Sequence, residues 1–285
     1  MYFRFTRSIV VTIALAGLLM GCSDDAPVTP ADDDAKAKVA ESTESAAEPV
    51  AVETTESEPA SDLPDSDDLD QLFEALAGGG LRDLESAREL TGEGSVARVY
   101  LEYLLSQANA LLDAGMPGAE ALESERTDDG YEGCEPYAGD DAVCVEWTEI
   151  EGADGVVVNF SINGQPIDEL LVAGNGTVIE AGNQGTFELL YAYQSPVSGN
   201  FFVALSAASA SSGMDVTGLY SATYRDPSGR QLGMLDATTP SELGADSTAT
   251  VFISFPAPAT IGGTINFDLY DLDDYSATTV TIPTA

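Results

Sequence analysis

The residues of this chain that could do chemistry are carboxylates and three cysteines. The sequence holds 49 Asp and Glu residues and three Cys, but it has no His, and no Lys follows Lys38. Ser-His-Asp and Cys-His catalysis, His-ligated metals and, beyond Lys38, Schiff-base chemistry are therefore excluded. The sequence also contains no Gly-x-Ser-x-Gly, Ser-x-x-Lys or phosphate-binding Gly-Lys motif.

Carboxylate pairs can hydrolyse glycosides when two acids face each other in a cleft and one of them has a raised pKa. Among 49 acidic residues the sequence singles out no such pair. We therefore predict a protein that is not an enzyme, with no catalytic residues and no cofactor. A carboxylate-dependent glycan-acting enzyme remains the alternative, and a cleft with two facing, buried acids would favour it.

The densest acidic cluster lies near the C-terminus and consists of Asp268, Asp271, Asp273 and Asp274. Oxygen ligands in a loop suit calcium, so these four residues are the candidate metal ligands. The cluster contains no glycine and has neither EF-hand nor nonapeptide spacing. A charged strand end that discourages edge pairing is the favoured interpretation, and no metal site is predicted.

Aromatic rings could form a flat platform for glycans. The candidates are Trp147, Tyr220, Tyr224, Tyr270 and Tyr275. Alternation along a strand places Tyr220 and Tyr224 on one face with two apolar residues, Val216 and Ala222, and such a face is more typical of a core.

Cys22 closes a short apolar segment that follows Arg4 and Arg7 and is too short to span a bilayer. The run Leu19-Met20-Gly21-Cys22 resembles the lipobox of bacterial lipoproteins. The resemblance implies that residues 1–21 are a signal peptide and that Cys22 is lipidated, with palmitate as an acyl chain. The partner of the anchor is then the membrane. Ser23, and not Asp, follows the cysteine, which resembles the outer-membrane-directed class of these lipoproteins. We therefore expect an outer-membrane location facing the periplasm or the cell surface.

Once Cys22 is lipidated, Cys134 and Cys144 remain as an even pair in an oxidising compartment, which predicts a disulfide. A redox or zinc role is disfavoured because the spacing is not Cys-x-x-Cys and no histidine is present to complete a zinc site.

The charge balance restricts the partners. The formal net charge is −39, and loss of Arg4 and Arg7 with the signal makes it more negative. Such a chain repels phosphate, so nucleic acid is excluded as a partner. Solubility is the favoured explanation for the acidic surface, and attraction of cations or a basic partner is the alternative.

Composition divides the chain into four parts. After the signal, residues 22–64 are acidic and carry no aromatic residue, which predicts a disordered tether. Residues 65–128 show helical periodicity. Ser66 and Ser95 are expected N-caps, Gly78-Gly79-Gly80 is expected to end the first helix, and a second short helix is expected from Leu81 to Leu90. A longer helix should follow through residue 114, with an apolar stripe that is interpreted as core, or in the minority interpretation as a surface for a partner helix.

Residues 129–285 alternate with a period of two and predict antiparallel strands with one wet face. Hairpin-like turns punctuate the run. They are Asn163-Gly164, Asn175-Gly176, Gly182-Asn183, Ser198-Gly199-Asn200 and Asp226-Pro227-Ser228-Gly229. The expected fold is mainly β, an antiparallel sandwich similar to immunoglobulin-like or jelly-roll modules. We therefore expect an anchored envelope lipoprotein whose sandwich is a non-catalytic binding or structural domain for an envelope protein or a glycan.

Overall fold

The computed structural model describes residues 62–118, 121–135, 143–258, 260–270 and 276–285. They belong to one compact unit that begins at residue 61. The expected signal peptide, Cys22 and all but the last three residues of the expected tether lie outside the described residues.

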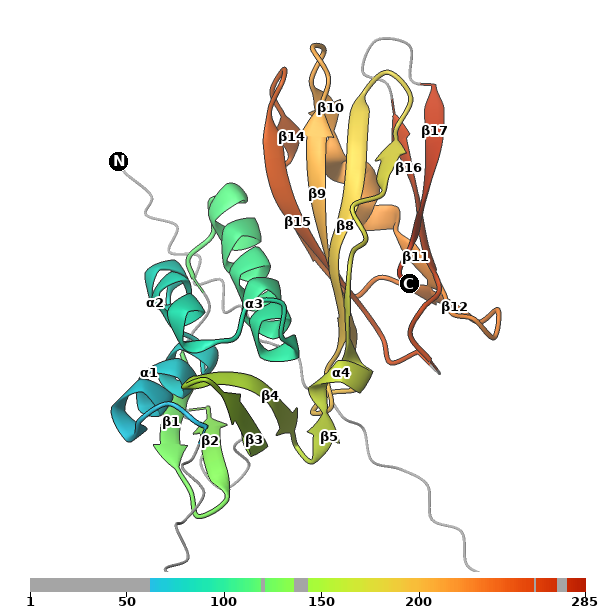
Figure 1. Cartoon of the computed structure of the whole chain (residues 1–285). Coiled ribbons are helices and arrows are strands. Elements are labelled where there is room, and N and C mark those ends of the chain that lie inside the picture. The colour runs from blue at the N-terminus through green and yellow to red at the C-terminus, as the bar shows by residue number, and fades with distance from the viewer. Residues whose placement is uncertain (1–61, 119–120, 136–142, 259, 271–275) are drawn as a thin grey trace, which may run out of the picture. The chain divides into compact units, whose positions relative to one another are not determined.

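Three helices come first (Figure 1). They are α1 (Ser66–Leu76), α2 (Leu81–Ala87), which continues into the 3₁₀ turn η1 (Arg88–Leu90), and α3 (Val96–Asp113). The cap of α1 is Asp65 and not the expected Ser66, because the Asp65 side chain accepts from the backbone N–H groups of Asp67 and Asp68. Ser95 caps α3 as predicted, accepting from Arg98 N at 3.2 Å.

A five-stranded antiparallel sheet follows in the order β1-β2-β3-β4-β5. Its strands are β1 (Glu123–Arg126), β2 (Gly130–Cys134), β3 (Cys144–Ala153), β4 (Val156–Ile162) and β5 (Gln165–Pro166). The hairpin from β4 to β5 turns at Asn163-Gly164, where both residues have positive φ, as the predicted two-residue turn requires. This sheet shares its core with the helices, with Phe73 of α1 packed between Tyr131 and Trp147. The expected boundary at residues 128 and 129 falls between β1 and β2, inside this sheet.

The remaining strands form a sandwich. A six-stranded sheet has the order β13-β15-β9-β8-β6, with β7 also paired to β8, and a four-stranded sheet has the order β12-β11-β16-β17. A two-stranded ribbon joins β10 (Met214–Asp215) to β14 (Glu242–Leu243). The six-stranded sheet contains β6 (Leu171–Ala173), β7 (Val178–Glu180), β8 (Gly185–Gln194), β9 (Phe201–Ser209), β13 (Asp236–Thr238) and β15 (Thr248–Phe255). The four-stranded sheet contains β11 (Thr223–Arg225), β12 (Gln231–Gly233), β16 (Thr264–Tyr270) and β17 (Ala277–Pro283).

The two sheets of the sandwich share one apolar core. Phe187 of β8 meets Phe267 of β16 with ring centroids 5.1 Å apart, and Phe201 of β9 meets Tyr224 of β11 at 4.6 Å. All strand pairs within these sheets are antiparallel. The prediction of a mainly β protein built as an antiparallel sandwich is therefore confirmed.

The six-stranded sheet has buried residues on both faces, because α3 packs on part of the face that the four-stranded sheet does not cover (Figure 1). Tyr103 of α3 packs on Tyr193 of β8 at 4.8 Å and on Phe252 of β15 at 5.8 Å. At the end of α3, the Asp113 carboxylate accepts from the backbone N–H of Thr250 at 2.7 Å. The helices and the sandwich thus form continuous layers.

One expected strand face is wrong. The period of two expected for residues 129–285 places Phe187, Leu189, Tyr191 and Tyr193 on one face, but a bulge at Leu190 shifts the register between Leu189 and Tyr191. Phe187 and Leu189 point into the sandwich core, whereas Tyr191 and Tyr193 point toward the helices. An extra residue in a strand reverses the faces of all that follow it.

Among the described residues, none of the helices combines the length and the apolar character needed to cross a bilayer.

Candidate functional site

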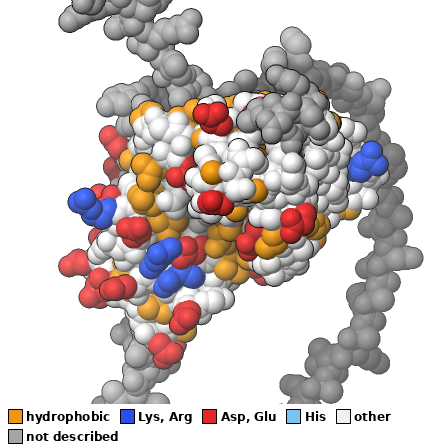
Figure 2. Space-filling model, turned by 90° about the horizontal axis from the view of Figure 1, so that it is seen from above, with side chains coloured by type: hydrophobic (Ala, Val, Ile, Leu, Met, Phe, Trp, Pro, Cys, Tyr) orange, Lys and Arg blue, Asp and Glu red, His pale blue; other side chains and the backbone are white. Residues whose placement is uncertain are grey.

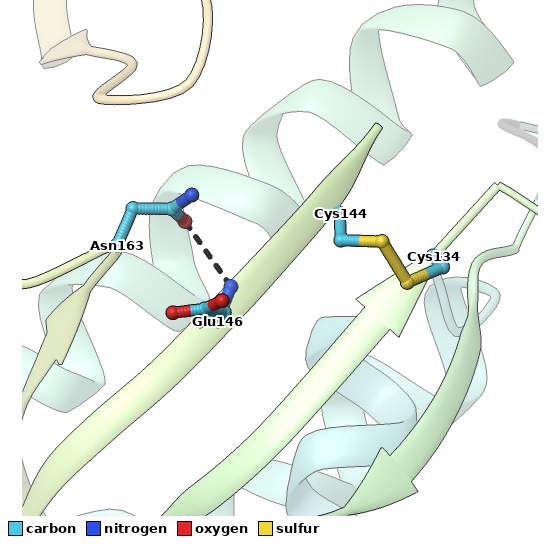
Figure 3. The surroundings of a disulfide bond; sticks show 4 residues. All are labelled: Cys134, Cys144, Glu146 and Asn163. Carbon is cyan, nitrogen blue, oxygen red and sulfur yellow. Dashed lines mark hydrogen bonds between the residues drawn. A yellow bond between two sulfur atoms is a disulfide. The ribbon is translucent and has the colours of Figure 1, made fainter. Parts of the chain in front are cut away.

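Cys134 and Cys144 form the predicted disulfide (Figure 3). They are directly opposite residues of β2 and β3, so the bridge joins neighbouring strands at the end of the five-stranded sheet. Beside it, Asn163 accepts from Glu146 N at 3.1 Å through its side chain and donates to Glu146 O at 2.9 Å through its backbone. These contacts fix β3 against the neighbouring hairpin.

Glu132 lies close to the disulfide, with a carboxylate oxygen within 4.8 Å of both sulfur atoms. A thiolate, and not a disulfide sulfur, is the metal ligand of cysteine, so the oxidised pair is not a metal site. The strand register also places Glu132 directly between Glu125 of β1 and Glu146 of β3. The three carboxylates repel one another, and like charges directly opposite each other destabilise a sheet.

The acidic cluster near the C-terminus is described only in part. Asp268 lies in β16 and accepts a hydrogen bond from Thr279 of β17 at 2.6 Å. The next pair along these strands is similar, with Thr281 donating to Asn266 at 2.7 Å. Asp271, Asp273 and Asp274 lie outside the described residues. In the described part of the cluster, the Asp268 side chain therefore links β16 to β17 through a hydrogen bond.

The candidate aromatic platform is divided between core and surface. Trp147 and Tyr224 are buried in different cores, whereas Tyr220 and Tyr270 are each 49 % exposed. The expected common face of Tyr220 and Tyr224 is wrong, because residues 216–221 form a 3₁₀ turn, η3 (Val216–Ser221), and not a strand. Tyr275 lies outside the described residues.

Among the Asp and Glu residues that the structure describes, Asp226 is the buried one, with 2 % of its surface exposed. Its Oδ1 accepts from the Ser228 hydroxyl at 2.6 Å and from Arg230 N at 2.9 Å. Asp226 begins the predicted turn between β11 and β12, so these bonds order that turn. Within the described ranges no second buried acid faces it.

A hollow with a volume of about 260 Å³ lies among the three helices. We call it the helical groove. Its lining is apolar apart from Gln107, and it contains no Asp, Glu, Arg, Cys or Ser. The lining residues are Ala75, Leu76, Gly78, Gly79, Gly80, Leu81, Leu84, Leu104, Gln107, Ala108, Leu111, Leu112, Met116 and Gly118.

One wall of the groove is a stripe of α3. Leu104, Ala108, Leu111 and Leu112 recur at i, i+4, i+7 and i+8, and they therefore lie on one helix face. The stripe is part of the apolar pattern that was interpreted as core, yet Leu112 is 63 % exposed, and Met116 beyond it is 43 % exposed. The buried aromatic residues of α3, Tyr100 and Tyr103, instead face the sheets.

Three glycines line the other side of the groove. Gly78-Gly79-Gly80 ends α1 as predicted, and a side chain at Gly79 would meet the Ala75 backbone at 2.8 Å. The backbone N–H groups of Gly78 and Gly79 both donate to Ala75 O, and that of Gly80 donates to the Asp83 carboxylate at 3.0 Å. The N–H groups of this loop are therefore already satisfied.

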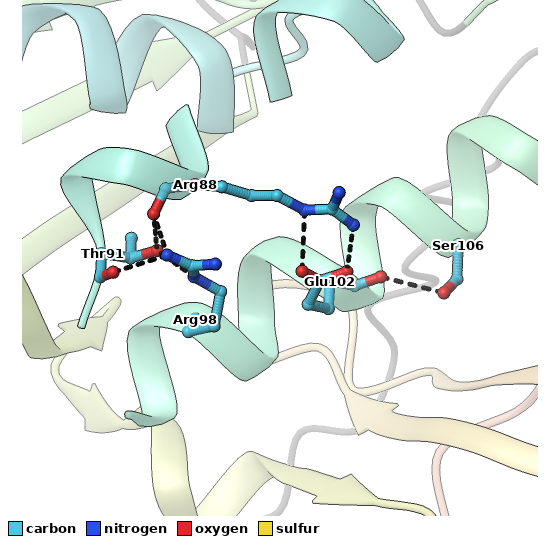
Figure 4. A network of polar contacts seen from close by, with 5 residues as sticks. All are labelled: Arg88, Thr91, Arg98, Glu102 and Ser106. Atoms are coloured by element: carbon cyan, nitrogen blue, oxygen red, sulfur yellow. Dashed lines mark hydrogen bonds and ion pairs between the residues drawn. The ribbon is translucent and has the colours of Figure 1, made fainter. Parts of the chain in front are cut away.

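A polar network holds α2 and η1 against α3 (Figure 4). The guanidinium of Arg88 donates twice to the Glu102 carboxylate, at 2.7 and 2.8 Å, and this pairing raises the pKa of Arg88 above its ordinary value. Arg98 donates to the carbonyls of Arg88 and Thr91 and to the Thr91 hydroxyl. Both arginines thus fix the spacing of two helices that line the groove.

Acidic residues border the groove. The exposed charged residues that adjoin its lining in sequence are Glu74, Arg82, Asp83, Glu85 and Asp113. Residues adjacent on a helix lie about 100° apart around its axis, so these side chains stand beside the lining. Figure 2 shows one face of the molecule, where acidic side chains are spread widely and hydrophobic side chains are exposed between them.

Comparison with known protein families and with curated proteins finds no match to this chain.

Proposed function

We propose that this chain is an outer-membrane lipoprotein, anchored through lipidated Cys22, whose folded unit binds an envelope partner without doing chemistry on it. The lipobox-like run Leu19-Met20-Gly21-Cys22 supports the anchor, and the disulfide suits an oxidising compartment.

One observation carries the binding role. The helical groove is open and apolar, and its lining holds no nucleophile and no acid or base. General acid–base and nucleophilic catalysis need such groups within hydrogen-bond reach of the reacting atoms. Leu112 and Met116 of the lining are instead exposed apolar side chains, as at a protein interface.

The alternative is a carboxylate-dependent glycan-acting enzyme. It needs a pair of facing acids, one with a raised pKa, and 49 acidic residues leave many pairs to consider. Among the described residues, the buried carboxylate of Asp226 is bonded within its own turn, and no second buried acid faces it.

Intact-mass analysis of the membrane-bound form tests the anchor. We expect a diacylglyceryl and acyl modification on a chain that begins at Cys22, and we expect release from the membrane in Cys22→Ala. The double variant Cys134→Ser/Cys144→Ser is the matched control and should stay anchored. An unmodified N-terminus in the membrane fraction would overturn the lipoprotein proposal. Turnover of any glycan in a panel of envelope polysaccharides would overturn the non-catalytic role.

A further inference from the structure

We propose that the helical groove docks a basic amphipathic helix of another protein, whose aliphatic side chains lie along α3 from Leu104 to Leu112. This inference rests on the proposed binding function and names the class of partner.

The shape of the groove suits about two turns of helix. Leu104 and Leu112 are eight residues apart on α3, a distance of roughly 12 Å along the helix axis. A helix that docks in a groove uses anchors at i, i+3 or i+4 and i+7, which is the same spacing. Two small residues of the lining, Ala108 and Gly118, allow the backbone of the occupant to come close.

The backbone of the occupant must satisfy its own hydrogen bonds. No described strand lines the groove, so an extended peptide would find no sheet edge with which to pair. The N–H groups of Gly78, Gly79 and Gly80 are already bonded. An extended chain would thus bury unpaired polar groups against leucines, whereas a helix pairs them internally.

Charge selects among helical occupants. Four acids and one arginine adjoin the lining, and the chain as a whole carries a formal charge of −39. A second copy of this chain would present the same negative surface, and residues 22–64 of the chain are also acidic, so both would be repelled. Lipids with anionic headgroups meet the same repulsion. A cationic helix is attracted, with Lys or Arg beside Glu74, Asp83 and Glu85.

The test measures binding of labelled peptides to the full-length protein by fluorescence anisotropy. The probe is a 15-residue helix-forming peptide with leucines at i, i+3, i+4 and i+7 and lysines at its exposed positions. A second peptide replaces every lysine with glutamate, and a third keeps the composition but shuffles the leucines. We expect the ordered lysine peptide to bind at least tenfold more tightly than either of the others, and its affinity to fall as salt is added.

Protein variants locate the binding site. Leu112→Ser/Met116→Ser removes exposed apolar side chains, so the fold should tolerate it. Gly118→Leu adds a large side chain to the lining of the groove, at a position where a Cβ atom meets no atom within 4 Å. Each variant should weaken binding of the lysine peptide at least tenfold. Leu235→Ser, which alters a leucine that is 55 % exposed in the sandwich, is the matched control and should bind as the wild type does.

Each outcome decides the proposal. If the groove variants bind the lysine peptide as the wild type does, the groove is not the docking site. If the glutamate peptide binds equally well, the basic partner is wrong. If oleate binds in place of the peptides and Gly118→Leu abolishes that binding, the groove holds lipid, the helix proposal falls and the non-catalytic binding function stands. Failure of the anchor or glycan tests would instead overturn the proposed function and leave this result unaffected.

Discussion

At the scale of single residues, polar contacts connect elements that are far apart in sequence. Asp70 of α1 accepts from the Tyr131 hydroxyl at 2.8 Å and from the Arg126 guanidinium at 2.6 Å. The hydrogen bond from Tyr131, followed by the one from Arg126, lowers the pKa of the Asp70 carboxyl. Asp70 therefore attaches α1 to both β1 and β2.

This contact predicts a pH dependence. A carboxyl whose pKa is lower in the folded state stabilises the fold above its unfolded pKa, near 3.8, and the contribution is lost as the pH falls through the folded pKa. Asp70→Asn should therefore lower Tm slightly at pH 7, because the Asp70 and Arg126 side chains are about half exposed, and the difference from the wild type should disappear in strong acid. Thermal melts between pH 2 and pH 7 check this. A constant difference over that range would contradict it.

The disulfide gives a second prediction at this scale. Cys134 and Cys144 are 10 residues apart, and closing so short a loop should stabilise the fold by about 2 to 3 kcal/mol. Cys134→Ser/Cys144→Ser should be less stable by that amount but still folded, since the large cores do not depend on the bridge. Urea denaturation measures the change, and wild type treated with reductant should match the double variant.

Glu132 gives a third prediction at this scale, and here the substitution should stabilise the fold. Glu132→Gln should stabilise the fold by about 0.2 to 1 kcal/mol, because it removes repulsion from Glu125 and Glu146 across the strands. Glu93→Gln removes the same charge from an exposed loop residue and serves as the control. Equal effects of the two variants in urea denaturation would show that only net charge matters.

At the scale of elements, turns were predictable and bulges were not. Asn163-Gly164, Gly182-Asn183 and Ser198-Gly199-Asn200 all lie between strands, because glycine at positive φ is a local requirement that the sequence displays directly. The bulge at Leu190 carries no such signal. It depends on the partner strand and on the α3 aromatic residues that receive Tyr193.

The bulge leads to a prediction. Gly174 packs against it, donating to Leu190 O at 2.8 Å, and a Cβ atom there would lie 1.7 Å from Leu189 O. Gly174→Ala should therefore destabilise the fold by about 3 kcal/mol, at the upper end of overpacking costs. Gly233→Ala, where a Cβ meets nothing within 4 Å, should be nearly neutral. Similar urea midpoints for the two variants would refute the close approach.

The candidate site was predictable in its parts but not as a whole. The α3 stripe and the glycine stop after α1 both follow from local rules of periodicity and helix termination. That Gly78, Gly79 and Gly80 face Leu104 and Leu111 across a hollow depends on how the helices pack. No pattern within either segment encodes that meeting, so the stripe was interpreted as core.

At the scale of the whole molecule, the sequence predicted strands but not their sheets. The strands β1 to β5 alternate like those of the sandwich, yet they pair among themselves and pack on α1 through Trp147. Alternation shows that one face is buried but does not show which layer buries it. The β-sandwich is therefore confirmed, whereas the sheet beside the helices was not foreseen.

The continuous layers predict that the described unit unfolds as one. Trp147 is the only tryptophan and lies in the core beside the helices, whereas most strands belong to the sandwich. Melting followed by Trp fluorescence and by far-UV circular dichroism should give the same midpoint. Tyr103→Ala, which opens the contact of α3 with Tyr193 and Phe252, should lower stability by about 3 kcal/mol.

Two separated midpoints in the wild type would show that the layers unfold independently. In Tyr103→Ala, a shift of only one signal would lead to the same conclusion.

β9 carries buried residues on both faces, and this has a consequence for biosynthesis. Its residues Phe201–Ser209 read Phe-Phe-Val-Ala-Leu-Ser-Ala-Ala-Ser, with no charge, and such a segment is prone to aggregate when exposed. The chain emerges N-terminus first, so α3 leaves the ribosome before β9 and can shield one side of it, while β16 and β17, which build the other cover, arrive last. The order of elements along the chain thus shortens the interval in which this uncharged strand is exposed to other chains.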